Sequence, residues 1–97
     1  MSNLNETIHQ PVRLRIMAAL VTLEASNEVD FTYLRELLDV TDGNLGAHLR
    51  KLEEASYIAV NKVFVERKPR TYVSATAEGR RVFQEHVAAL EAILKGK

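Results

Sequence analysis

The side chains best suited to chemistry in this sequence are cations, and they fall in two short groups. One is the run Arg67-Lys68-Pro69-Arg70, and the other comprises His48, Arg50 and Lys51. Guanidinium, ammonium and imidazole groups bind phosphate oxygens through charge-assisted hydrogen bonds. The two groups therefore predict a surface that binds a phosphate-rich partner.

Two further histidines, His9 and His86, raise the possibility of a metal site. The chain has no cysteine, and no carboxylate stands at ligand spacing beside either histidine. We therefore expect no metal and no cofactor. The sequence also lacks a glycine-rich phosphate loop and any pattern that would activate a nucleophile, so it does not predict an enzyme.

Length and composition favour one globular domain over residues 1–97. Hydrophobic residues make up 46% of the chain and charged residues 27%, which is ordinary for a soluble protein. The longest apolar run, Ile16 to Val21, is too short to span a bilayer, and the first residues lack a signal-peptide pattern. With no cysteine to oxidise, these features predict a cytoplasmic protein.

The formal net charge is zero, but the charges are unevenly distributed. Residues 1–42 carry three Arg against seven acidic residues, whereas residues 43–81 carry eight Lys or Arg against four Glu. A basic face can attract nucleic acid whatever the total charge of the molecule. The charge distribution therefore supports the anion-binding interpretation.

Hydrophobic periodicity predicts the elements that must position these cations. Helices are expected over about 10–24, 31–38, 42–55 and 76–94, with Asp30, Thr41 and Thr76 as N-caps. A loop is expected at Ser26–Glu28. Residues 57–75 alternate with period two and predict a hairpin, with its turn at 66–70 and its second strand at 71–75. The inward side chains expected in the second helix are Phe31, Leu34, Leu37 and Leu38, and Tyr33, Tyr57 and Tyr72 are expected in the core or the hairpin.

The third helix has one narrow apolar stripe, formed by Leu45, Leu49 and Leu52. Its opposite side carries Asn44, Ala47, His48 and Lys51, with Gly46 and Arg50 on the flanks. The first and last helices, by contrast, have more apolar positions than one core can cover. A second copy of the chain is the expected cover, and the predicted dimer contacts are Leu14, Met17, Val21, Phe83, Val87, Leu90 and Leu94.

The element order is helix, helix, tight turn, helix, basic hairpin and helix, which is the winged helix-turn-helix arrangement. The segments 30–45, 48–55 and 57–58, the run Arg67-Lys68-Pro69-Arg70-Thr71-Tyr72 and the helix start Thr76-Ala77-Glu78-Gly79-Arg80 resemble the MarR/ArsR-type bacterial and archaeal winged-helix regulators. The resemblance covers nearly the whole chain from Pro11 and is specific to the superfamily.

The resemblance implies a homodimeric transcription regulator that places two recognition helices in successive major grooves of double-stranded DNA. The DNA-binding residues it implies are Asn44, Gly46, Ala47, His48, Arg50 and Lys51 on the recognition helix, and Arg67, Lys68 and Arg70 on the wing. Gly46 and Ala47 depart from the Ser, Thr or Arg common at these positions. They allow close approach to the bases but make no bidentate base contact.

Two other functions stay open on the sequence. A winged helix can serve as a protein-interaction module without touching DNA, as the zero net charge and the small residues Gly46 and Ala47 allow. The family resemblance also implies a possible small-molecule effector of unknown identity. Arg80 and Arg81 are expected to be solvated or to form ion pairs within the chain.

Overall fold

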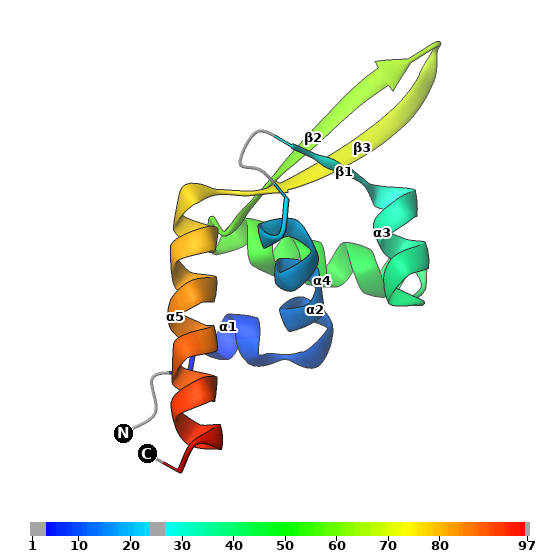
Figure 1. The fold of residues 1–97 in the computed structure, drawn as a ribbon. Helices are drawn as coiled ribbons and strands as arrows, with labels where there is room; N and C mark the ends of the chain where they lie inside the picture. Colours follow the sequence, from blue (N-terminus) through cyan, green and yellow to red (C-terminus); the bar gives the residue numbers. More distant parts are fainter. Residues whose placement is uncertain (1–3, 24–26, 97) are drawn as a thin grey trace.

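The computed structural model describes residues 4–23 and 27–96. The helices in these ranges are α1 (Glu6–His9), α2 (Pro11–Val21), α3 (Phe31–Leu38), α4 (Asp42–Glu54) and α5 (Ala77–Leu94), and the strands are β1 (Val29–Asp30), β2 (Ile58–Val65) and β3 (Lys68–Ala75). The β2–β3 hairpin projects beyond the helical body (Figure 1). The predicted fold class, mainly helical with a small hairpin, is confirmed.

The hydrophobic core lies where α2, α3 and α4 meet the base of the hairpin. The predicted stripe of Leu45, Leu49 and Leu52 is buried in it, and Val73 of β3 closes it from the side of the sheet. Each fully buried aliphatic side chain contributes roughly 1.5–3 kcal/mol. This packing holds the leucine side of α4 against the body and leaves the other side of the helix outward.

Side-chain caps begin three helices at the predicted positions. Asp30, Thr41 and Thr76 each accept a hydrogen bond from a backbone N–H in the following turn, at 2.7, 3.1 and 2.9 Å. These bonds satisfy donors that have no partner inside the helix. The starts of α3, α4 and α5 therefore follow from local sequence.

The helix predicted over about 10–24 is present as α2, but it begins one residue later and ends earlier than expected. Gln10 is extended, with φ −65° and ψ 133°, and Pro11 begins α2, which ends at Val21. A residue before proline is sterically disfavoured in the helical region, so the chain breaks here and α1 stands as a separate helix. Glu24 of the predicted helix and Ser26 of the predicted loop lie outside the described residues.

The sheet has the order β1-β3-β2 and is antiparallel throughout. Strand β1, which the sequence did not predict, pairs Val29 with Val73 and Asp30 with Tyr72. Asp30 therefore both ends β1 and caps α3, which ties the start of α3 to the base of the hairpin.

The turn of the hairpin is shorter than predicted, because β3 begins at Lys68 rather than at Thr71. Only Glu66 and Arg67 form the turn, with φ of 52° and 67°. Positive φ at both central residues is the conformation of a two-residue turn whose twist matches the strands. The predicted loop over 66–70 is wrong because pairing between the strands continues through this charged run.

Three apolar side chains do not lie where periodicity placed them. Met17, predicted at a dimer interface, is fully buried in the core of its own protomer and cannot reach a partner. On α3, Leu37 and Tyr33 were expected inside but are 50% and 59% exposed. The reason is the same in each case, since periodicity shows that a face is apolar but not which surface covers it.

Helix α5 runs down one side of the body (Figure 1). Its buried positions are Gly79, Val82 and His86. The predicted seam of Phe83, Val87 and Leu90 lies beside this buried face and is half-exposed, while Leu94 is exposed. No helix within the described ranges is both long and apolar enough to cross a membrane.

Candidate nucleic-acid interface

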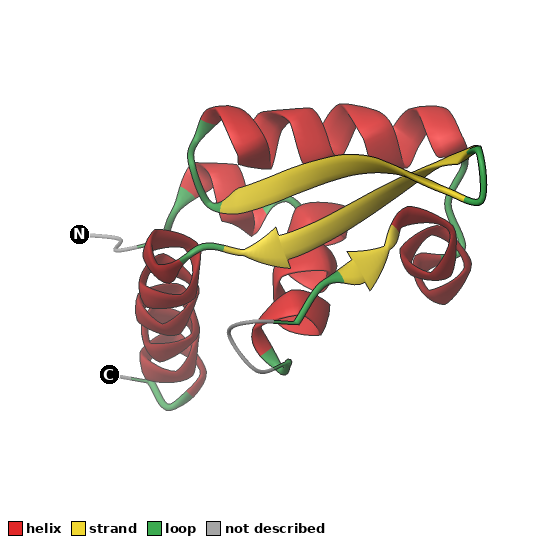
Figure 2. Ribbon diagram, turned by 90° about the horizontal axis from the view of Figure 1, so that it is seen from above, coloured by secondary structure: helices red, strands yellow, loops and turns green. Residues whose placement is uncertain are grey.

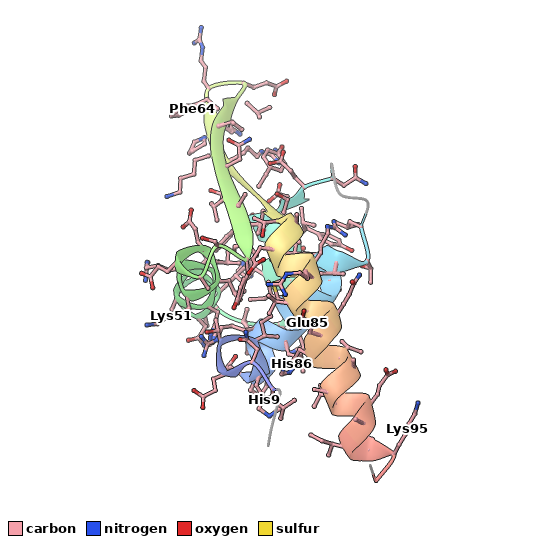
Figure 3. The ribbon with its side chains drawn as sticks, turned by 90° about the vertical axis from the view of Figure 1, so that its left-hand side faces the viewer. His9, Lys51, Phe64, Glu85, His86 and Lys95 are labelled. Carbon is pink, nitrogen blue, oxygen red and sulfur yellow. The ribbon has the colours of Figure 1, made fainter. Side chains whose placement is uncertain are left out.

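The outward side of α4 is the centre of the candidate interface. Its exposed residues include Gly43, Asn44, Ala47, Arg50 and Lys51. Lys51 points away from the body, and α4 lies at the edge of the molecule (Figure 3). The side of this helix opposite its leucine stripe therefore faces solvent.

Two residues predicted for this interface lie on its flanks, as expected for Gly46 but not for His48, which was predicted on the outward side. Gly46 is half-buried and lines a groove of about 260 Å³ between α4 and the hairpin. His48, on the other flank, is also half-buried, and its partial burial, helped by the positive charge of Arg13, lowers its pKa. Arg50, which was predicted at a flank, is fully on the exposed side.

Arg13 of α2 was not predicted as a site residue. Helix α2 packs against α4, and the positive charge of Arg13 contributes to the lowered pKa of His48. Among the described residues, no group accepts a hydrogen bond from the buried Nε of Arg13. No local signal reveals this effect, because only the packing of α2 against α4 brings the two helices together.

Lys62 is a second cation that the prediction omitted. It lines the same groove as Gly46, together with Leu49 of α4 and Val60 of β2. Seen from above, α4 runs alongside the hairpin (Figure 2), so Lys62 stands between the two predicted parts of the site. The alternation of Val60 and Lys62 along β2 is a sequence signal that could have placed Lys62 on this face.

The end of the hairpin presents its cations to solvent. Arg67 occupies the turn itself, and Lys68 follows as the first residue of β3; both are exposed. A residue other than glycine in the left-handed region costs of order 1 kcal/mol or more, so Glu66 and Arg67 hold the turn at an energetic cost. Such local strain is found most often where a residue has a function.

Arg70 was predicted in the turn at the end of the hairpin, but it lies within β3. Its Nη1 lies 3.0 Å from Oδ2 of Asp30. Oδ1 of the same carboxylate caps α3. The ion pair is partly exposed, so it contributes little to stability, but it links the hairpin to α3 and offsets part of the charge of Arg70.

A second ion pair links α3 to α4. Nε of Arg35 lies 2.9 Å from Oδ1 of Asp42 across the tight turn between the helices.

In Figure 3 the hairpin rises on the side of the molecule where α4 lies, and α5 lies on the other side. The outward face of α4 and the hairpin therefore lie on the same side of the molecule in this view.

His9 and His86 lie together, away from this cationic side (Figure 3). The backbone N–H of Asn5 donates to Nδ1 of His86 at 3.0 Å. Neutral His86 therefore carries its proton on Nε2, the nitrogen that faces His9, and a protonated nitrogen is a poor metal ligand.

The two arginines early in α5 are both engaged within the chain. Arg81 pairs with Glu78 and Glu85 at 2.8 and 2.7 Å. Nη1 of Arg80 donates to the carbonyl oxygen of Val21, at the end of α2, at 3.1 Å. The expectation of ion pairs within the chain is confirmed for Arg81. Arg80 instead donates a hydrogen bond to the C-terminal end of α2.

This arrangement is that of a known family. A family model described as a winged helix DNA-binding domain matches residues 12–94. The chain belongs to this winged-helix family. The predicted helix-turn-helix with a wing and the resemblance to winged-helix regulators are thereby confirmed, and the hairpin β2–β3 is the wing.

Individual proteins are similar to this chain over most of its length. The uncharacterized protein MJ0432 of Methanocaldococcus jannaschii is 38% identical over 76 residues, which are 78% of this chain and 79% of that protein. A transcriptional regulator homologue from Pyrococcus horikoshii OT3 is 33% identical, with a TM-score of 0.86, over 95% of this chain and 88% of that one.

More distant structures share the winged-helix fold. A PadR family transcriptional regulator from Eggerthella lenta DSM 2243 is 23% identical, with a TM-score of 0.71, over 94% of this chain and 85% of that one. The family model and the Pyrococcus horikoshii structure together show a winged-helix domain of the type found in DNA-binding transcription regulators.

Proposed function

We propose that the protein is a homodimeric transcription regulator that binds duplex DNA with α4 in the major groove and its wing on the flanking phosphates or minor groove. The observation that carries this proposal is the common side shared by the outward face of α4 and the cationic wing. The B-DNA major groove, about 12 Å wide, admits one α-helix. The organisation as one domain over 1–97 remains a prediction.

The outward side of α4 suits entry into a groove. Small residues, Gly43 and Ala47, leave room at its centre, and Asn44, Arg50 and Lys51 surround them with hydrogen-bonding groups. A Cβ added at Gly43 or Gly46 would meet no protein atom within 4 Å. The absence of Cβ at these positions is not needed for packing inside the protomer, which supports a role in close approach to DNA.

The proposed roles of the cations follow from their places. Arg50 and Lys51 reach base edges or phosphates from α4, and Arg67 and Lys68 bind phosphates from the wing. His48 and Gly46 contribute at the flanks of α4. Arg70 contributes less than the other wing cations, because Asp30 already pairs with it.

The apolar surface that one protomer leaves uncovered supports the proposed homodimer. Half-exposed Phe83, Val87 and Leu90 continue into exposed Leu94 along α5. Leu14 and Val21 of α2 are also only half-buried. Met17 is fully buried and takes no part in the proposed interface. A dimer would space two α4 helices for half-sites about 34 Å apart.

The test is selection of bound duplexes from a random pool at two salt concentrations. We expect an approximately palindromic motif and an affinity that falls steeply with salt. Lys51→Ala should weaken binding to the selected duplex about tenfold. Lys95→Ala is the matched control, since it removes the same charge at the far end of the molecule (Figure 3). A pool that yields no motif at either salt concentration would overturn the proposal.

A further inference from the structure

The outer half of the wing carries an exposed aromatic side chain. Phe64 of β2 lies near the end of the wing (Figure 3) and is 77% exposed. Strand periodicity places it on the same face as Ile58, Val60 and Lys62. Ile58 is buried and Val60 half-buried, so this face packs on the body at its base and is free at its end.

Pro69 lies directly opposite Phe64 in the register of the hairpin. The pair next to a two-residue turn is hydrogen-bonded, so the next pair, Phe64 and Pro69, is a non-hydrogen-bonded pair with closely spaced side chains. Pro69 therefore loses no ladder bond, and β1 pairs only with Tyr72 and Val73, which leaves this edge of β3 open. Phe64 and Pro69 form one apolar pair, which we call the wing wedge.

Cations flank the wing wedge along the hairpin. Lys62 precedes it on the same face, and Arg67 and Lys68 follow it at the end of the hairpin, with Glu66 as the only acid between Lys62 and Arg70. A single exposed apolar residue needs no explanation. An aromatic–proline pair with cations on either side along the hairpin is different, because it matches a partner with apolar surface between two rows of negative charge.

The minor groove of duplex DNA has that structure, since its sugar walls and the base steps at its floor lie between two phosphate strands. We propose that the wing wedge enters the minor groove flanking the site of α4 and bends the duplex there. Apolar wedges between base steps kink DNA away from the minor groove, and the neighbouring cations bind the phosphates on either side. The inference rests on the proposed function, since it assumes that α4 binds DNA.

A sequence preference follows at positions that α4 does not touch. Pyrimidine–purine steps unstack and kink at lower cost than other steps. Duplexes selected by the protein should therefore be enriched in TA or CA steps where the wing lies. This preference should disappear when Phe64 is truncated, because the bend then no longer contributes to binding.

The experiment compares the full chain with Phe64→Ala on the duplex returned by selection, labelled at both ends for energy transfer. Because Phe64 is exposed, the variant should keep the melting temperature of the parent. We expect about tenfold weaker binding, a straighter duplex and an unchanged salt slope, since no cation is lost. Val65→Ala, a truncation on the opposite face of β2, is the control and should retain the bend.

The outcomes separate the two proposals. If the parent protein binds no duplex, the proposed function itself is wrong. If the parent binds but Phe64→Ala binds and bends DNA equally well, only the wing wedge is overturned. A Phe64→Ala variant that changes the oligomeric state while leaving the bend intact would also overturn it, because Phe64 would then contact protein.

Discussion

Nδ1 of His9 lies 3.3 Å from Nε2 of His86, with the two ring planes 59° apart. His86 is buried and also accepts a hydrogen bond from the Asn5 backbone. The Asn5 side chain in turn donates to the hydroxyl of Tyr57 at 3.0 Å. The segment around α1 is thus linked to α5 through His86 and to the start of the wing through the Asn5 side chain.

Protonation of His86 should loosen this connection. Burial, followed by the proximity of His9, lowers the pKa of His86 below its usual 6.5. The stabilising contribution is therefore complete above pH about 6.5 and is lost as pH falls through the lowered pKa. The free energy of unfolding, measured by urea denaturation between pH 7.5 and 5, should fall by up to about 1.4 kcal/mol per pH unit for this proton.

His86→Asn isolates the contribution of this histidine. The Asn Oδ1 can replace Nδ1 as acceptor for the Asn5 N–H but does not titrate, so the pH dependence should become shallower even though the variant is less stable. His48 keeps its share of the dependence, because its pKa is also lowered. An identical pH profile in the variant and the parent would contradict the role of His86.

Gly79→Ala should be strongly destabilising. A Cβ at Gly79 would collide with the backbone carbonyl of Tyr57, which cannot move aside as a flexible side chain would. We expect a loss of about 2–3 kcal/mol in thermal or urea unfolding. Gly43→Ala is the control, since a Cβ there meets open space, and its stability should be unchanged or slightly higher. Equal stability of the two variants would contradict the close packing of α5 on the wing.

Asp30→Asn should free Arg70 for DNA. The amide oxygen can still cap α3, and loss of a partly exposed ion pair should cost less than about 1 kcal/mol. With one acid fewer and one more cation available, DNA affinity should rise and the salt slope should steepen by about one. Titrations at several salt concentrations measure this, with Glu91→Gln of α5 as the distant control. Unchanged affinity would mean that Arg70 does not reach DNA.

Val87→Asp should separate the proposed dimer. Val87 is half-exposed on α5, so the fold can tolerate the charge, whereas an apolar interface cannot. Light scattering at micromolar concentration should report a monomer for the variant and a dimer for the parent. Gln84→Asp, a charge on the exposed side of α5, should remain dimeric. A monomeric parent protein would rule out the dimer.

Residue types and their spacing were enough to place α3, α4, α5 and most of the wing. The caps at Asp30, Thr41 and Thr76 act on backbone groups two or three residues away, so their signal is local. The leucine stripe of α4 is equally local, because one helix face recurs every three or four residues. The candidate surface could therefore be found as a helix face and a cationic hairpin.

Short elements and distant pairings left no such signal. Helix α1 has four residues and β1 has two, too few for a period to appear. The pairing of β1 with β3, the ion pair of Arg70 with Asp30 and the effect of Arg13 on the pKa of His48 join segments far apart in the chain. Each depends on how helices and strands pack, and no spacing along the sequence encodes it.

The sequence alone thus determined which helix and strand faces are apolar or cationic. Tertiary packing decided whether each of those side chains is buried or exposed. Met17 and Leu90 are both apolar helix residues predicted at the dimer interface, yet one is buried in its own protomer and the other is half-exposed. The physical reason is that the hydrophobic effect is non-directional. It requires apolar surface to be covered, and only the arrangement of the other elements determines what covers it.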